Sequence, residues 1–121
     1  MRPIYARTRL VFAVMLAMAW VALPGPAGAD ERADCEKLSG EASINACTAV
    51  IEAGTYKAAD LSTAYLNRGL EYFAQRAYDQ AIADYTSSIA LDAKKADVYN
   101  NRGNAYHAKR DYAKAIRDFN R

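Results

Sequence analysis

The chain of 121 residues repeats itself at a spacing of 34 residues, and this recurrence constrains its fold more than any other feature. Moving YLNRGLEYF (65–73) forward by that spacing places it on YNNRGNAYH (99–107). A fixed period between about 20 and 50 residues is typical of stacked units that cannot bury their apolar faces alone. We therefore expect function on a surface built by stacking and not in a catalytic pocket. The matching positions are Tyr65 with Tyr99, Asn67 with Asn101, Arg68 with Arg102, Gly69 with Gly103, Tyr72 with Tyr106, Tyr78 with Tyr112, Ala81 with Ala115, Ile82 with Ile116, Asp84 with Asp118 and Tyr85 with Phe119.

These residues resemble the tetratricopeptide repeat, a 34-residue helix-turn-helix unit with the pattern W-x2-L-G-x2-Y, then A-x3-F, then P. The resemblance covers residues 62–121 and implies an all-α fold, a short helix-turn-helix repeat solenoid. Three sites depart from the pattern: Tyr replaces Trp, Arg replaces Leu before the glycine, and Ala93 replaces Pro. The pattern falls on Tyr65, Arg68, Gly69, Tyr72, Ala81, Tyr85 and Ala93, and again on Tyr99, Arg102, Gly103, Tyr106, Ala115 and Phe119.

The spacing of apolar and small residues predicts first helices at 62–75 and 96–109, and second helices at 78–92 and 112–121. We expect the tyrosine stripe between these helices to form core. Arg68 with Asp84, and Arg102 with Asp118, recur in both units, which predicts ion pairs that fix the helix register. The predicted organisation is a signal peptide at 1–29, a degenerate cysteine-linked hairpin at 30–54, a linker at 55–61, one repeat at 62–95 and a second, incomplete repeat at 96–121.

The first 29 residues have the composition of a secretory signal peptide. Their apolar run is shorter than the roughly 20 residues that a membrane span needs, which argues against an uncleaved anchor. The arginines lack twin-arginine spacing, and Cys35 lacks the setting of a lipid-modified N-terminus. We expect an exported protein, periplasmic or secreted, whose mature chain begins at Asp30 and has no membrane attachment after cleavage. The marks are Arg2, Arg7 and Arg9, the apolar run Leu10 to Leu23, and the cleavage site Ala27-Gly28-Ala29.

The charge of the chain gives no sign of a nucleic-acid partner. The signal segment holds three of the 16 basic residues and none of the 14 acidic ones, so its removal changes the net charge from +2 to −1. No basic run exceeds two residues, and Lys and Arg are interleaved with Asp. Nucleic-acid binding needs a concentrated basic patch or stripe, which this order of residues does not indicate.

The two cysteines, Cys35 and Cys47, fall one period before Gly69 and Ala81. In the repeat family these small-residue sites lie where the two helices of a hairpin approach most closely, so the resemblance implies disulfide geometry. An even cysteine count in an exported protein also favours a bridge. We predict a Cys35–Cys47 disulfide that staples the N-terminal hairpin. A redox or metal pair is the alternative, although the spacing is not C-x-x-C and no ligand cluster converges on it. The hairpin is indicated by Gly40, Gly54 and the stripe Ile44, Cys47, Val50 and Ile51.

The resemblance also implies a groove lined by the first helix of each repeat, at its second, fifth, ninth, twelfth and thirteenth sites. One wall is then apolar, and the other offers side-chain amides that can pair with a peptide backbone. A clamp for a peptide's terminal carboxylate is not expected, because Lys and Arg are absent from these sites. An alternative stays open, in which Leu66, Leu70 and Phe73 pack against the N-terminal hairpin. The groove sites are Thr63, Leu66, Leu70, Phe73 and Ala74, then Asp97, Asn100, Asn104, His107 and Ala108.

No motif indicates catalysis. The single histidine, His107, has no Ser, Cys or carboxylate partner at a catalytic or metal-binding spacing, and no phosphate loop or dinucleotide fingerprint is present. We expect a non-enzyme without cofactor or metal that holds a protein or peptide partner in the cell envelope.

The sequence stops partway through a repeat unit, with Ile116 and Phe119 near its end. Three explanations stay open: a natural short protein, a truncated one, or a structural oligomer that buries this face. An accessory domain of an envelope enzyme is a further alternative.

Overall fold

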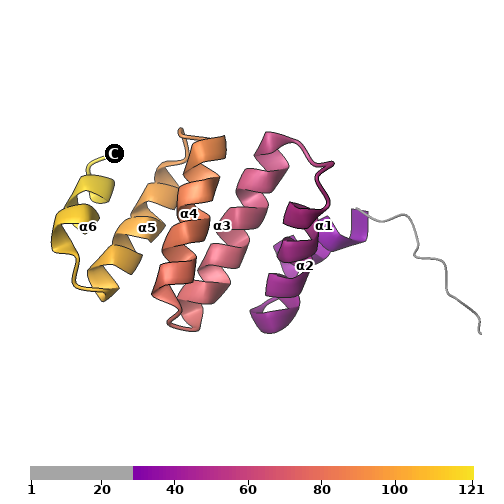
Figure 1. The fold of residues 1–121 in the computed structure, drawn as a ribbon, viewed down its shortest axis with the longest axis horizontal. Helices are drawn as coiled ribbons and strands as arrows, with labels where there is room; N and C mark the ends of the chain where they lie inside the picture. Colours follow the sequence, from indigo (N-terminus) through magenta and orange to yellow (C-terminus); the bar gives the residue numbers. More distant parts are fainter. Residues whose placement is uncertain (1–28) are drawn as a thin grey trace, which may run out of the picture.

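The computed structural model describes residues 29–121, which form six α-helices and no strand. Figure 1 shows the helices as a row that runs from α1 to α6. The predicted signal peptide lies outside the described residues, except that Ala29 begins α1. The helices are α1 (Ala29–Lys37), α2 (Gly40–Glu52), α3 (Ala58–Ala74), α4 (Tyr78–Leu91), α5 (Ala96–Ala108) and α6 (Tyr112–Phe119).

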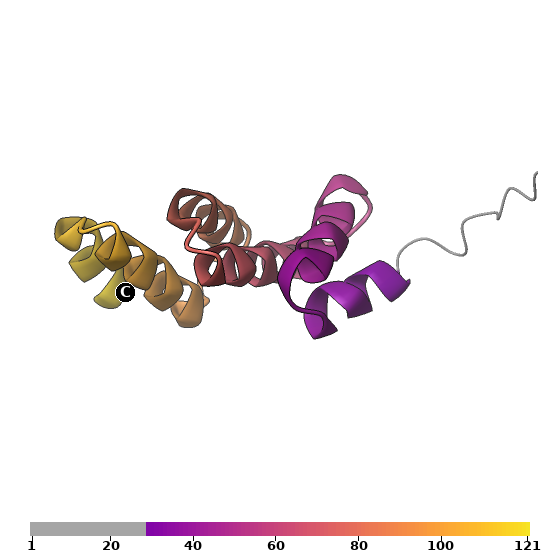
Figure 2. The same cartoon turned by 90° about the horizontal axis from the view of Figure 1, so that it is seen from below.

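Successive helices pair into three hairpins, α1 with α2, α3 with α4, and α5 with α6. Each hairpin also contacts the next, through α2 with α3 and α4 with α5, and the first helices of adjacent hairpins touch. The hairpins follow one another along the row in the second view as well (Figure 2). The predicted all-α helical repeat is therefore confirmed.

Helix α3 begins at Ala58, four residues before the start that we predicted, so the expected linker at 55–61 is largely helical. Two alanines favour helix at this point, and the carboxylate of Asp60 in the first turn complements the helix dipole. Asp60 also accepts a hydrogen bond of 3.0 Å from Arg32 of α1. The break between α2 and α3 is short, residues 53–57, and it contains Gly54, whose φ of 67° ends α2 as expected.

Two apolar clusters lie along the row. The first joins the N-terminal hairpin to α3 through Cys35, Cys47, Val50 and Ala64. The second joins α4 to α5 through Ala81, Tyr85, Val98 and Ala105, with Leu66, Tyr72, Phe73, Ile82 and Ile89 packed around it. Each cluster spans the junction between two hairpins, so a single hairpin does not bury its apolar face alone, as expected for a solenoid.

Glycine is required where the two helices of a repeat approach most closely. A Cβ atom added to Gly69 would lie 2.7 Å from Cε1 of Tyr85, and one added to Gly103 would lie 2.6 Å from Cε1 of Phe119. Both distances are far below van der Waals contact, so an aromatic ring occupies the space that a side chain would need. The recurrence of glycine and an aromatic residue in both repeats thus reflects direct contact between the glycine of the first helix and the ring of the second.

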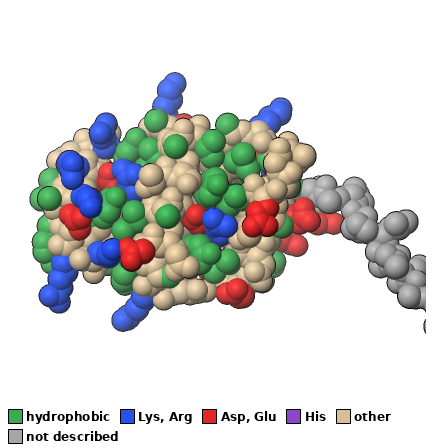
Figure 3. Space-filling view, in the orientation of Figure 1, with side chains coloured by type: hydrophobic (Ala, Val, Ile, Leu, Met, Phe, Trp, Pro, Cys, Tyr) green, Lys and Arg blue, Asp and Glu red, His purple; other side chains and the backbone are tan. Residues whose placement is uncertain are grey.

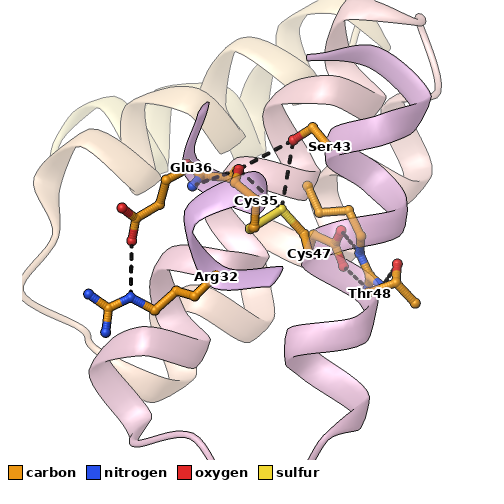
Figure 4. The surroundings of a disulfide bond; sticks show 9 residues. Arg32, Cys35, Glu36, Ser43, Cys47 and Thr48 are labelled. Carbon is orange, nitrogen blue, oxygen red and sulfur yellow. Dashed lines mark hydrogen bonds and ion pairs between the residues drawn. A yellow bond between two sulfur atoms is a disulfide. The ribbon is translucent and has the colours of Figure 1, made fainter. Parts of the chain in front are cut away.

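The predicted disulfide joins Cys35 of α1 to Cys47 of α2, with 4.6 Å between their Cα atoms. Both cysteines are buried, and the Ser43 hydroxyl donates to the carbonyl oxygen of Cys35 at 3.4 Å (Figure 4). The bridge crosses the contact between α1 and α2. It therefore ties down the short α1, a nine-residue helix that contributes little apolar surface of its own.

Candidate functional site

The arginines that depart from the repeat pattern are structural. Nε and Nη2 of Arg68 donate to the two carboxylate oxygens of Asp84 at 2.8 and 2.9 Å. Arg102 binds Asp118 in the same bidentate way, at 2.7 and 2.8 Å. The hydrogen bond to the carboxylate raises the pKa of each arginine, so both stay charged. The two predicted ion pairs are present.

Each of these arginines also reaches back to the preceding hairpin. Nη1 of Arg68 donates to the hydroxyl of Thr48 on α2 at 2.9 Å, and Nη1 of Arg102 donates to that of Thr86 on α4 at 3.1 Å. One guanidinium thus joins three helices, which accounts for Arg at a site where the family pattern has Leu.

The tyrosine stripe is core only in part. Tyr85 is fully buried, and burial raises its pKa. Tyr112 is exposed. Four tyrosines are half-buried, and their rings flank the arginines: Tyr65 and Tyr72 beside Arg68, and Tyr99 and Tyr106 beside Arg102, with the guanidinium carbon 5.6 to 5.9 Å from each ring centre.

A hollow of about 170 Å³ opens between α3 and α5, and we call it the α3/α5 hollow. Leu70 and Phe73 of α3 form one side, and Asn101 and Asn104 of α5 form the other. The ring of Tyr85 from α4 also lines it. An apolar wall therefore faces a pair of side-chain amides that can donate and accept hydrogen bonds.

Three of the ten groove residues predicted from the sequence lie together at this hollow: Leu70, Phe73 and Asn104. Leu70 is 41% exposed, whereas Phe73 is half-buried and packs against the second apolar cluster. Leu66 is half-buried in the same cluster. Of the three residues in the packing alternative, Leu66 and Phe73 thus pack against the second apolar cluster, whereas Leu70 is exposed.

The other predicted groove residues lie away from the hollow. The Thr63 hydroxyl accepts from Nζ of Lys95 at 3.2 Å, which links α3 to the segment before α5. Asp97 and Asn100 are exposed on α5. His107 is exposed and packs edge-on against Tyr112, as Phe73 packs against Tyr78 one period earlier.

Two residues of the hollow, Tyr85 and Asn101, were missing from the predicted site. Asn101 is the counterpart of Asn67 one period later. The groove positions implied by the family resemblance do not include this site. The structure separates the pair. Nδ2 of Asn67 donates to the carbonyl of Cys35 at 3.5 Å and so belongs to a hairpin junction, whereas Asn101 lines the hollow. Only the packing of neighbouring hairpins reveals this difference.

Within residues 29–121 no group of three or more His, Cys, Asp or Glu residues could hold a metal ion. Over the same range no helix is both long and apolar enough to span a membrane. The arrangement offers apolar packing and hydrogen bonding to a partner.

Comparison with known protein families finds that residues 69–110 match the family model described as TPR repeat. The matched range runs from Gly69 in α3 through α4 to the end of α5, and so contains the α3/α5 hollow entirely. No curated protein matches the chain.

Proposed function

Since this chain is a tetratricopeptide-repeat protein, we propose that it is a non-catalytic module that binds an extended segment of a partner protein in the α3/α5 hollow. Repeats of this family generally mediate protein-protein interaction. The observation that carries the proposal is the meeting of Leu70 and Phe73 with Asn101 and Asn104 around one hollow.

The size of the hollow favours a peptide anchor over a small molecule. Small-molecule sites usually enclose about 300–1,000 Å³, whereas this hollow encloses about 170 Å³. One apolar side chain of a bound peptide fits against Leu70 and the ring of Phe73. The amides of Asn101 and Asn104 can then pair with the peptide backbone on either side of that anchor, which is a recurring mode of peptide recognition.

We place this function in the cell envelope, either the periplasm or outside the cell. The proposal is supported by the signal-like residues 1–29 and by the buried disulfide, because disulfides persist in oxidising compartments and are rare in the cytosol. N-terminal sequencing of the exported protein tests it, with Asp30 as the expected first residue. Retention of Met1 in a membrane fraction would contradict it.

Binding can be tested by selecting peptides from a random library on the immobilised protein and measuring their affinity for variants. Leu70→Asn and Asn104→Ala are each expected to weaken binding about tenfold, which is a typical loss for one well-placed interface contact. Both residues are exposed, so the melting temperature should change little. Leu91→Asn is the matched control, because Leu91 is similarly exposed on α4 outside the hollow.

Selected peptides that bind Leu70→Asn and Asn104→Ala as tightly as the unchanged protein would exclude the hollow as the binding site. Equal weakening by Leu91→Asn would also contradict the proposal, because it would show that binding follows general surface hydrophobicity.

Self-assembly is a second candidate function, favoured by the apolar surface of α6. Tyr112, Ile116 and Phe119 are 52%, 59% and 46% exposed. Their counterparts one period earlier, Tyr78, Ile82 and Tyr85, are half-buried or buried. A second copy that covers α6 would make sedimentation depend on protein concentration, and Ile116→Asn would abolish that dependence. A monomer at all concentrations excludes this function.

A further inference from the structure

A second hollow, of about 280 Å³, lies between α5 and α6, and basic side chains dominate it. We call it the α5/α6 hollow. It shares no residue with the α3/α5 hollow, so it is a separate surface of the molecule. Its lining residues are Arg102 and Tyr106 of α5, Lys114, Arg117 and Asp118 of α6, and Arg121 just beyond.

The basic residues of this hollow are scattered in the sequence. Lys114, Arg117 and Arg121 are spaced three and four residues apart, which places them on one side of α6 and its continuation. Because no two of them are adjacent, a search for basic runs does not find them. On the face shown in Figure 3, most of the Lys and Arg side chains lie over the α5–α6 end of the molecule, whereas acidic groups gather near α1 and α2.

The cluster is absent from the first repeat. One period earlier, Lys114, Arg117 and Arg121 are replaced by Gln80, Ala83 and Ser87. Arg102, Tyr106 and Asp118 are matched by Arg68, Tyr72 and Asp84. The scaffold of the hollow is thus common to both units, and the extra positive charge belongs to the second unit alone. The repeat fold does not need these three cations.

Two of the cations are not held in an ion pair, although the pKa of the Asp111 carboxyl is lowered chiefly by its hydrogen bond from Lys114 and also by the charge of Arg117. Arg102 is neutralised by Asp118, and Nζ of Lys114 lies 2.9 Å from a carboxylate oxygen of the half-buried Asp111. In the described part of the chain, neither Arg117 nor Arg121 forms an ion pair.

Aromatic rings hold two of these cations beside the hollow. The Arg121 guanidinium lies over the ring of Tyr99 at 5.9 Å, and Nζ of Lys114 lies over the ring of Tyr106 at 5.4 Å. These contacts limit the positions of the flexible side chains without neutralising their charge.

We propose that the α5/α6 hollow is a second binding site, which takes the carboxylates of an acidic segment on a partner protein. The cations there that form no ion pair are two guanidinium groups, Arg117 and Arg121, and guanidinium binds carboxylate in a bidentate fork. A nucleic acid is disfavoured, because two guanidinium groups at one hollow are fewer than the extended basic stripe that a row of phosphates requires.

The test uses a fluorescein-labelled peptide of alternating Glu and Ala, titrated into the purified protein at low salt with anisotropy as the readout. The double variant Arg117→Gln/Arg121→Gln removes both of these guanidinium groups and is expected to bind it about tenfold more weakly, within the range that two exposed ion pairs supply. The control is Arg76→Gln/Lys94→Gln, which removes the same charge from exposed sites outside the hollow and should bind like the unchanged protein.

Circular dichroism should show the same helix content in all three proteins, because Arg102 and Asp118 are left in place. A peptide with Gln in place of Glu should not bind. Binding should weaken as salt increases, since exposed ion pairs are screened.

Four results would overturn the proposal. Equal weakening by the control variant would mean that net charge attracts the peptide, not the hollow. Competition by inorganic phosphate at a matched concentration of charge would assign the site to a small oxyanion. Tighter binding of a single-stranded DNA oligonucleotide than of the acidic peptide would assign it to nucleic acid. Loss of peptide binding through Leu70→Asn would also place it elsewhere, while leaving the proposed function of the α3/α5 hollow intact.

Discussion

The repeat unit at 62–95 and the unit at 96–121 share their internal contacts and differ in what they show to solvent. The Arg68–Asp84 and Arg102–Asp118 pairs agree to within 0.1 Å in both of their hydrogen bonds. On the surface, by contrast, Leu70 corresponds to Asn104. Residues that fix the helix packing are therefore the same in both units, whereas exposed residues that make no packing contact differ between them. Specific recognition has to arise from the second group.

Burial of one aromatic ring is the main energetic difference between the two units. Tyr85 and Phe119 each lie over a glycine of the preceding helix, Gly69 and Gly103. Tyr85 is 1% exposed, because α5 covers it, whereas Phe119 is 46% exposed. The same contact between a ring and a glycine thus contributes more to the free energy of unfolding in the first unit than in the second.

The largest expected effect comes from this pair of rings. Tyr85→Ala should lower the free energy of unfolding by about 3–5 kcal/mol, because it empties a fully packed site. Phe119→Ala should cost less than about 2 kcal/mol, since half of its surface is already in water. Urea denaturation followed by circular dichroism measures both. Losses of equal size would show that α5 does not protect Tyr85 in solution.

Removal of the disulfide should come next in size. Cys35→Ala/Cys47→Ala is expected to cost about 3 kcal/mol in the chain-entropy account of a loop of this length. Amide exchange should show the largest loss of protection in α1 and α2 and none in α5 and α6, because the first apolar cluster contains both cysteines and the second contains neither. Reduction of the unchanged protein is the control and should give the same pattern. Uniform loss along the row would mean that the first hairpin supports the whole solenoid.

Removal of the aspartate from each ion pair tests whether two pairs with the same geometry contribute equally to the stability of the protein. Asp84→Ala and Asp118→Ala each leave a half-buried guanidinium without its carboxylate, at a cost of about 2 kcal/mol. We expect Asp84→Ala to lower global stability and Asp118→Ala to increase only the local opening of α6, as in a row held by nearest-neighbour contacts. Amide exchange of α3 and α4 distinguishes the two, since it should stay unchanged in Asp118→Ala.

The smallest effect concerns the turns inside the two repeats, which have matching backbone strain. Arg76 and Arg110 have φ angles of 61° and 63°, in the left-handed region that favours glycine. Arg76→Gly and Arg110→Gly should each stabilise the protein by about 0.5 kcal/mol, because relief of strain exceeds the added chain entropy. Calorimetry should show a rise in melting temperature of about 2–4 °C for each variant. A fall in either would mean that the arginine side chain makes a stabilising contact.

Much of this fold could be predicted from the sequence because its key contacts recur at one spacing. The helix pairs, the ion pairs and the small sites at Gly69 and Gly103 all follow from the period of 34. The early start of α3 was missed because its N-cap residue, Lys57, makes no side-chain cap and so leaves no signal. The hollows were harder to predict. Asn101 and Tyr85 reach the α3/α5 hollow only after two hairpins pack, and Arg117 meets Arg102 only across α5 and α6.

The arginines that bridge three helices also make the hairpins interchangeable. Arg102 finds the Thr86 hydroxyl 16 residues before it and the Asp118 carboxylate 16 residues after it. A duplicate of residues 62–95, inserted after residue 95, would carry its own arginine, aspartate and threonine at these separations. Every new junction would then have the bonding partners of the present one. The row of helices can therefore be lengthened by whole repeats while the hydrogen bonds at each junction between hairpins stay the same. The number of repeats can thus vary with the length of the partner segment that is bound.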